Sequence, residues 1–186
     1  EIMPSLVGSE MCIRDSSSYM DSNGDGYGDL EGIRSRLSYI KELGFNVIWI
    51  SPVFCSKFED GGYDITDFYK IDPRFGTNTD LVNLVNDAHA MDIKVCLDLV
   101  AGHTSDKHPW FLESANGDPN GHYADYYIWT KGKETTPPKP ERGGWVKNEY
   151  PRDGYYLMNY YDIQPALNYG SVSYTHLRAH ETRHDL

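Results

Sequence analysis

The sequence predicts an α/β fold in which short buried strands alternate with amphipathic helices. Two segments, residues 30–43 and 81–88, carry apolar residues at helical spacing. Each is followed by a short, almost continuously apolar run, at residues 47–50 and 93–100. Runs of this kind are typical of parallel strands that are buried on both faces. Two such repeats favour either a doubly wound sheet or a (β/α)8 barrel.

Residues with strong positional preferences mark where these elements begin and end. Gly44 follows the first helical pattern, and glycine commonly ends helices because it tolerates a left-handed backbone. Ser51 and Pro52 close the first apolar run. Residues 77–80, Thr-Asn-Thr-Asp, form a capping-box-like start before the second helical pattern. We therefore expect the order helix, strand, helix, strand over residues 30–100.

The regular pattern stops after His103. Residues 104–170 contain many aromatic side chains, two Asn-Gly pairs and a Thr-Thr-Pro-Pro-Lys-Pro run, with no clean periodicity. A connection of this length is seldom a passive loop and more often forms a lid or an inserted subdomain. We therefore predict two parts, with the βα repeats in residues 17–103 and an insertion in residues 104–170.

Composition restricts the classes of function. The 186 residues carry a formal net charge of −11, which argues against a nucleic-acid partner because phosphate binding requires clustered Lys and Arg. No run approaches the ~18 apolar residues of a membrane span. The 3 cysteines are too few and too widely spaced for a disulfide framework. The 15 tyrosines and 4 tryptophans offer flat faces that suit sugar rings, although we expect most of them to be core residues.

The two ends of the chain differ in pattern and composition from the residues between them. Residues 1–16 and 171–186 resemble translated sequencing-adapter segments, and we predict that both are foreign tails. The second tail contains His-Glu-x-x-His at 180–184, a pattern found in zinc proteases. Only two residues follow it and no apolar face supports a helix, so no zinc site is predicted there. No signal-peptide pattern is visible; location is left open, with the cytoplasm favoured over secretion.

A loop near the start of the chain has the chemistry of a cation site. Oxygen-bearing side chains alternate with glycines, an arrangement that allows them to converge on one point together with a backbone carbonyl. The expected ligands are the side chains of Asp21, Asn23, Asp25 and Asp29 and the carbonyl of Tyr27. Ca²⁺ prefers such an all-oxygen shell, and Mg²⁺ is a second possibility. The loop is not an EF-hand, because Gly32 stands where the bidentate Glu would be. The alternative is a polar turn without metal.

Several strings together carry a family resemblance. DSNGDGYGDL, ELGFNVIWISPVF, GGYDITDFYKIDPRFGT, KVCLDLVAGHTSDKHPWF and QPALN occur in this order within residues 17–170. They resemble glycoside hydrolase family 13, the α-amylase family, and in particular its α-glucosidase, oligo-1,6-glucosidase and trehalose-synthase branch. The resemblance implies a partial (β/α)8 barrel in which residues 45–52 and 94–100 are strands two and three. Residues 104–170 would then be the inserted domain B, and the first strand would be lost.

The resemblance also implies a sugar site. Asp60 and Tyr63 look like the carboxylate and the aromatic platform of the −1 subsite, and His103 is expected to hydrogen-bond a sugar hydroxyl. Asp98 is expected to position an Arg of the next strand. The alternatives are a solvated acid for Asp60, a packing residue for Tyr63 and a structural histidine for His103. Asp64 is either a structural acid or a ligand contact.

Two positions depart from the family pattern. Gly102 stands where an Asn usually holds a second calcium ion in the amylase branch, so that second site is not expected. Ala166 replaces the Asp of the QPDLN version that is linked to exo-acting α-glucosidases. The second departure leaves the preferred glycosidic linkage open.

The resemblance implies a retaining mechanism, in which a carboxylate nucleophile and a carboxylic acid lie ~5 Å apart. By the family pattern both follow residue 170, so we expect an N-terminal fragment that has no hydrolase activity alone. The parent protein is expected to act on α-glucosidic bonds of starch-derived or other oligosaccharides. The alternatives are a transglycosylase or isomerase such as trehalose synthase, and a non-catalytic amylase-like binding subunit. The sequence does not indicate an oligomeric state.

Overall fold

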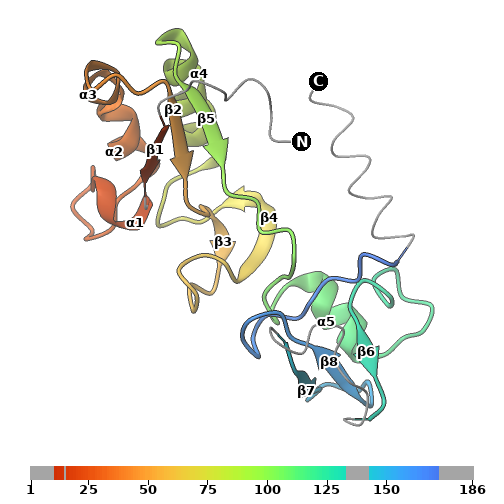
Figure 1. Cartoon of the computed structure of the whole chain (residues 1–186). Coiled ribbons are helices and arrows are strands. Elements are labelled where there is room, and N and C mark those ends of the chain that lie inside the picture. The colour runs from red at the N-terminus through yellow and green to blue at the C-terminus, as the bar shows by residue number, and fades with distance from the viewer. Residues whose placement is uncertain (1–10, 15, 133–142, 172–186) are drawn as a thin grey trace. The chain divides into compact units, whose positions relative to one another are not determined.

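The computed structural model describes residues 11–14, 16–132 and 143–171. Contacts divide the chain into two compact units (Figure 1). One unit, which we call the sheet unit, comprises the chain up to Cys55 and the segment Phe68–Leu99. The other, which we call the insertion unit, comprises Ser56–Asp67 and the chain from Val100 onward. Each unit is described by itself.

A parallel three-stranded sheet forms the centre of the sheet unit. Its strands are β1 (Met11–Arg14), β2 (Val47–Ile50) and β5 (Lys94–Leu97), in the order β1-β2-β5. Val47 pairs with Met11 on one side and with Lys94 on the other. Most of β2 is buried, as expected for a central parallel strand covered on both faces.

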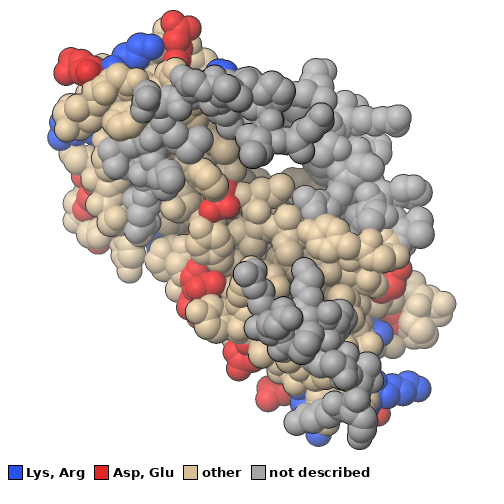
Figure 2. All heavy atoms as spheres, viewed as in Figure 1, with Lys and Arg blue, Asp and Glu red and all other residues tan. Residues whose placement is uncertain are grey.

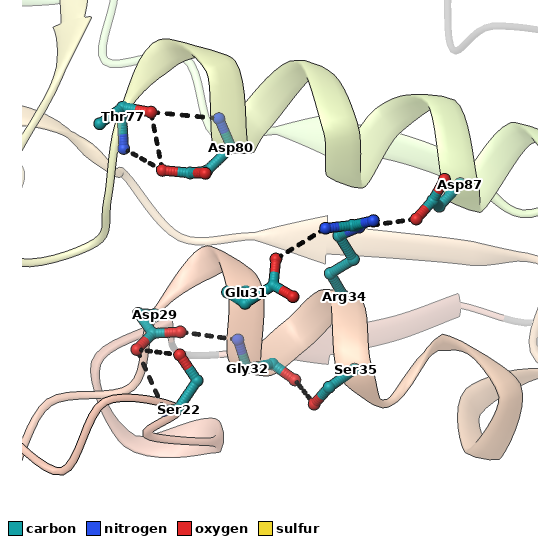
Figure 3. Close-up of polar contacts among 9 residues, drawn as sticks. All are labelled: Ser22, Asp29, Glu31, Gly32, Arg34, Ser35, Thr77, Asp80 and Asp87. Atoms are coloured by element: carbon teal, nitrogen blue, oxygen red, sulfur yellow. Dashed lines mark hydrogen bonds and ion pairs between the residues drawn. The ribbon is translucent and has the colours of Figure 1, made fainter.

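The sheet unit also contains helices, one of which packs against the sheet. The unit contains α1 (Ser16–Tyr19), α2 (Leu30–Ser35), α3 (Leu37–Glu42) and α4 (Asn78–Ala90), and α4 packs against β5 and α2. The capping box predicted for the second helix is confirmed: Thr77 Oγ1 accepts a hydrogen bond from the Asp80 amide at 3.3 Å. In return Asp80 Oδ2 accepts from the Thr77 amide at 2.8 Å (Figure 3).

The first predicted helix is divided in two. The segment 30–43 was expected to form one helix, but the backbone leaves helical geometry at Arg36, which has φ −108° and ψ 6°. The Arg36 amide bonds to Ile33, three residues back, which tightens the last turn of α2. The predicted end at Gly44 is confirmed, because this residue follows α3 with φ +89°.

The sheet contains one strand more than the sequence predicted. The family resemblance implies that the first strand is lost, yet Met11–Arg14 pairs in parallel with β2. The physical reason is that strand pairing uses backbone groups, so a segment without a recognisable side-chain pattern can still extend an edge. The foreign origin of residues 1–16 and 171–186 stays a prediction. Residues 1–10 and 172–186, the second range including the His-Glu-x-x-His pattern, lie outside the described residues.

An aromatic core holds the insertion unit together. Its helix α5 (Pro109–Asn116) lies beside an antiparallel sheet of β6 (Trp129–Thr130), β8 (Tyr155–Leu157) and β7 (Trp145–Lys147), in that order (Figure 1). The Phe111 ring packs edge-on against Tyr127 and Tyr156, with centroids 5.1 and 4.9 Å away. It also stacks on Trp129 at 5.8 Å.

The division into units differs from the predicted boundary at residue 103. The insertion unit begins at Val100 and also takes in Ser56–Asp67, which comprises the end of β3 (Phe54–Ser56), the loop that follows it and the start of β4 (Ile65–Ile71). A backbone hydrogen bond of 2.8 Å from the Ser105 amide to the Ile65 carbonyl is one of the bonds that attach this loop. Hydrogen bonds between residues far apart in the sequence leave no periodic pattern, so the sequence does not indicate that residues 56–67 belong to this unit.

On the face shown in Figure 2, the acidic side chains do not gather in one dominant patch. They occur at several places, and basic side chains are scattered among them. Arg34 illustrates this mixture, because it bonds Asp87 of α4 at 2.6 Å and Glu31 at 2.9 Å (Figure 3). In the part of the chain that the structure describes, no helix has the length and apolar character needed to cross a membrane.

A buried histidine caps the helix of the insertion unit. His108 is the N-cap of α5, where its Nδ1 accepts from the Trp110 amide at 3.1 Å. Burial lowers the pKa of His108 to about 4, although the charge of Asp67 opposes the shift. In the unfolded chain His108 is therefore protonated below about pH 6.5, whereas in the folded unit it is protonated only below about pH 4.

We predict that the free energy of unfolding falls by up to about 3 kcal/mol between pH 6.5 and pH 4 through this group. His108→Asn keeps a capping acceptor but removes the titration, so this part of the pH dependence should disappear. Urea unfolding of the 186-residue chain across this pH range measures the slope. His89→Asn, an exposed change on α4, is the control, and equal slopes for His108→Asn and the unchanged chain would contradict the prediction.

Candidate sugar site and cation loop

The loop between β3 and β4 presents two of the predicted site residues. Its turn is closed by a hydrogen bond of 2.9 Å from the Tyr63 amide to the Asp60 carbonyl. Gly61 and Gly62 have φ of +58° and +100°, a region that glycine adopts without steric cost. Asp60 is half-buried, and the Tyr63 side chain is 38% exposed. The loop thus carries a carboxylate and an exposed aromatic residue at the two ends of one turn.

Asp64 is a fully buried acid that holds this loop from within. Its two carboxylate oxygens accept from the backbone amides of Glu59 at 3.2 Å and Asp60 at 3.3 Å. Hydrogen bonds of this kind offset the cost of removing a charge from water. Of the two roles left open for Asp64, the structural one matches these contacts.

Gln164 orients the Asp60 carboxylate. Its side chain is fully buried, and its Nε2 donates to Asp60 Oδ2 at 2.6 Å. Its Oε1 accepts from the Tyr161 amide at 3.3 Å. The QPALN stretch at 164–168 does not by itself indicate a role for Gln164. The only available indication was the family resemblance of that stretch, because a polar residue between apolar ones does not reveal its partner.

His103 is buried and has protein partners on both ring nitrogens. Nε2 lies 3.0 Å from the Tyr63 carbonyl oxygen, and Nδ1 lies 3.0 Å from Nδ2 of Asn159. A carbonyl oxygen only accepts, so Nε2 carries the proton and Nδ1 accepts from the Asn159 amide. Burial lowers the pKa of His103, while the Tyr63 carbonyl and the charges of Asp60 and Asp64 oppose this shift. The imidazole is therefore neutral at pH 7.

The structure brings together three of the four predicted sugar-site residues. Asp60, Tyr63 and His103 all belong to the insertion unit and are linked by the bonds described above. Asp98 belongs to the sheet unit, directly after β5, where its amide donates to the Ile50 carbonyl at 3.1 Å. Sequence reasoning did not identify Asn159, because nothing in the local pattern connects it with His103.

A cavity of about 640 Å³ lies in the insertion unit close to these residues. Gly102, Asn159, Tyr160, Ala166, Asn168 and Tyr169 are among its lining residues. The rings of Tyr160 and Tyr169 are about half exposed, and the Tyr169 hydroxyl donates to the Ala101 carbonyl. The volume lies in the range of small-molecule sites, and the lining combines aromatic rings with amide groups.

The predicted cation loop is held by its own backbone. Asp21 accepts three amide hydrogen bonds, from Gly24 at 2.6 Å, Gly26 at 2.8 Å and Asn23 at 3.1 Å. The bonds from Gly26 and Gly24 are the main reason that the pKa of Asp21 lies below its ordinary value. Further along, the side chains of Asn23 and Asp25 accept from the amides two residues ahead, at 2.9 and 2.8 Å. The first three predicted side-chain ligands are therefore held by short-range bonds.

Asp29 has a helix-capping role that sequence analysis did not foresee. Its Oδ1 accepts from the Gly32 amide at 2.6 Å as the N-cap of α2, and its Oδ2 accepts from the Ser22 amide and hydroxyl (Figure 3). Among the described residues, no three or more His, Cys, Asp or Glu side chains are grouped so that they could hold a metal ion. The oxygen-only chemistry of the loop suits a hard cation, but ligation would require a closer grouping of the carboxylates.

Comparison with known proteins identifies the family. The family model described as "Alpha amylase, catalytic domain" matches residues 16–176, which is most of the chain. An oligo-1,6-glucosidase of Bacillus cereus is 48% identical over 157 residues, which cover 82% of this chain and 28% of that enzyme. A trehalose synthase/amylase of Mycolicibacterium smegmatis is 42% identical over 157 residues, with 81% and 26% covered.

A solved structure extends the similarity to the fold. The crystal structure of an isomaltulose synthase from Klebsiella sp. LX3 matches with a TM-score of 0.85 at 36% identity, covering 94% of this chain and 32% of that one. The chain thus spans between a quarter and a third of the length of these three relatives. On the family match and on the identity to these enzymes, the chain belongs to glycoside hydrolase family 13, the α-amylase family.

Proposed function

We propose that this chain is the N-terminal part of a retaining α-glycoside hydrolase that acts on α-glucosidic bonds of oligosaccharides. The observation that carries the proposal is the pairing of Asp60 with a buried Gln164, in the same turn as the exposed Tyr63. A carboxylate with one oxygen fixed by the protein can accept from sugar hydroxyls with the other. A flat ring next to it suits the apolar face of a pyranose.

The chemistry of bond cleavage is assigned to residues outside this chain. A retaining mechanism needs a nucleophilic carboxylate and a carboxylic acid ~5 Å apart. In our proposal the family nucleophile and acid follow residue 170, so Asp60, Asp64 and Asp98 are not nucleophiles. Asp60 and Tyr63 bind the glucosyl unit, and Asp98 positions an Arg of the next strand. The hydrogen bond from His103 to a sugar hydroxyl stays a prediction, because both of its ring nitrogens have protein partners in this structure.

A second candidate function is glucosyl transfer or isomerisation on the same site. Two of the three relatives named above are a trehalose synthase/amylase and an isomaltulose synthase, whereas the third is an oligo-1,6-glucosidase. Binding of the glucosyl unit would be common to all three reactions. The acceptor, water or sugar, is then chosen by parts of the protein beyond this chain. A non-catalytic binding subunit has no support among these relatives.

We predict that the purified 186-residue chain cleaves no aryl α-glucoside, because the nucleophile and the acid are missing. Release of nitrophenol from a nitrophenyl α-glucoside is the measurement, with a complete oligo-1,6-glucosidase as the positive control. Turnover that rises in proportion to the concentration of the chain would overturn the assignment of the catalytic carboxylates.

A chimera tests the sugar site itself. Residues 17–170 replace the matching segment of the Bacillus cereus oligo-1,6-glucosidase, and the chimera is expected to hydrolyse the aryl α-glucoside. Asp60→Asn keeps an acceptor for Gln164 but removes the charge, so kcat/KM should fall about 10- to 100-fold. Asp153→Asn, at an exposed acid of the insertion unit, should change kcat/KM less than about twofold. Equal kcat/KM for the two variants would contradict the role of Asp60.

We further propose that the loop 21–29 binds a structural cation, Ca²⁺ in preference to Mg²⁺. The side chains of Asp21, Asn23, Asp25 and Asp29 and the carbonyl of Tyr27 would supply the ligands. Three carboxylates and two neutral oxygens suit the flexible oxygen shell of Ca²⁺, whereas Mg²⁺ demands a near-ideal octahedron. The ion would fix the entry to α2, since Asp29 also caps that helix.

We predict that Ca²⁺ raises the melting temperature of the 186-residue chain relative to EDTA. At a concentration a hundredfold above Kd the gain is about 2–3 kcal/mol. Asp21→Asn with Asp25→Asn removes two charges while keeping acceptors for the loop amides, so the shift should vanish. The matched control changes two exposed acids of the insertion unit, Asp118→Asn with Asp153→Asn. An equal Ca²⁺ shift in both double variants, or none in the unchanged chain, would contradict the site.

A further inference from the structure

One short turn of the insertion unit contacts both polar side chains of the sugar site. The turn covers residues 159–164 and is closed by backbone hydrogen bonds between the Asn159 amide and the Gln164 carbonyl and between the Gln164 amide and the Tyr161 carbonyl, both 2.9 Å. Asn159, at its start, donates to His103, and Gln164, at its end, donates to Asp60. The two contacts therefore depend on one rigid segment.

The contacts form a closed ring of bonds. His103 Nε2 donates to the Tyr63 carbonyl, and the Tyr63 amide donates to the Asp60 carbonyl. Asp60 Oδ2 accepts from Gln164, and the turn leads back to Asn159 and His103. A ring of this kind fixes each member through two neighbours, so the orientation of one side chain is coupled to the others.

Gly102 leaves room for this arrangement. A Cβ atom at position 102 would lie 2.9 Å from Nδ2 of Asn159, closer than such atoms approach. The backbone of Gly102 is not in the left-handed region, so a side chain there would act through this contact rather than through strain. A side chain at position 102 would therefore press on the amide end of Asn159, and the glycine that departs from the family pattern leaves that space open.

We propose that Asn159 and Gln164 are positioning residues, which act as a pair on the −1 subsite. Asn159 holds His103 as the neutral Nε2–H tautomer, and Gln164 holds Asp60 Oδ2 so that Oδ1 is presented to the sugar. This inference rests on the proposed function for its catalytic meaning, but the contacts themselves are properties of the chain alone. Fixing binding groups before the ligand arrives lowers the entropic cost of binding.

The first test follows the ring nitrogens of His103 in the 186-residue chain by ¹⁵N NMR. The unchanged chain should show a proton on Nε2 and none on Nδ1 at pH 7.5. Asn159→Leu removes the donor that favours the neutral ring, so the pKa of His103 rises, while the Tyr63 carbonyl still keeps the proton of the neutral ring on Nε2. Asn159→Asp places a carboxylate at Nδ1 and should raise that pKa by about 1–3 units.

The surroundings of His103 determine how these shifts are assigned. The charges of Asp60 and Asp64 and the ring of Tyr160, with its centroid 5.9 Å from that of His103, face the imidazole in every variant. Gly102→Ala leaves all of these in place and should reproduce the effect of Asn159→Leu. Asn120→Leu, at an exposed asparagine of the same unit, is the control. Unchanged His103 nitrogens in both Asn159→Leu and Gly102→Ala would overturn the role of Asn159.

The second test applies a double-mutant cycle to Gln164 in the chimera. Gln164→Leu should lower kcat/KM about tenfold, mainly through a higher KM, because Asp60 loses its orientation. In an Asp60→Ala background the same change should cost less than about twofold, since Gln164 acts through Asp60. Equal losses in both backgrounds would show a general structural effect and overturn the role of Gln164.

The two tests separate this inference from the proposed function. If the chimera with the unchanged segment is inactive on the aryl α-glucoside, the proposed function fails and with it the catalytic role of Gln164. The NMR measurement still decides the role of Asn159, because it requires no substrate. If the chimera is active while the His103 nitrogens do not respond, the proposed function stands and the positioning role of Asn159 is wrong.

Discussion

The hydrogen bond between Gln164 and Asp60 joins residues 104 positions apart, and the geometry of the candidate site depends on it. Gln164 has no solvent exposure, and a buried amide without partners would favour the unfolded chain, in which water solvates it. Both ends of the buried Gln164 amide have a hydrogen-bond partner: its nitrogen donates to Asp60, and its oxygen accepts from the Tyr161 amide. The loop 57–64 therefore belongs to the insertion unit, although along the chain it follows β2 and β3.

Two buried histidines give the insertion unit a common dependence on the neutral imidazole. His108 accepts from the Trp110 amide at the start of α5, and His103 accepts from Asn159 at the site. Burial lowers both pKa values, which keeps both rings neutral at pH 7. Protonation would convert each acceptor into a donor facing another donor. Protonation in acid is therefore expected to weaken both the helix cap at His108 and the contact between His103 and Asn159.

Asp29 shows how one carboxylate can connect a loop with a helix. Its oxygens already accept from Gly32 at the start of α2 and from Ser22 within the loop 21–29. A cation would have to share this carboxylate with those amides, and carboxylate oxygens can do so because each has more than one acceptor direction. Cation binding and the start of α2 would then be coupled. The ion pair between Arg34 and Asp87 contributes little to the stability of the fold, because both side chains are partly exposed to water.

The sequence by itself determined the alternation of helices and strands, the capping box at Thr77, the helix end at Gly44 and the family. These features rest on periodicity, on local turn chemistry or on strings of neighbouring residues, and all are readable over short windows. It did not reveal the strand Met11–Arg14, whose pairing uses only backbone groups, or the paired strands β3 and β4 between β2 and α4. Only the tertiary structure decided that Asn159 contacts His103, 56 residues away, and that Gln164 contacts Asp60. Such contacts arise when a folded core brings distant segments together, and no local pattern encodes which buried polar groups will then become partners.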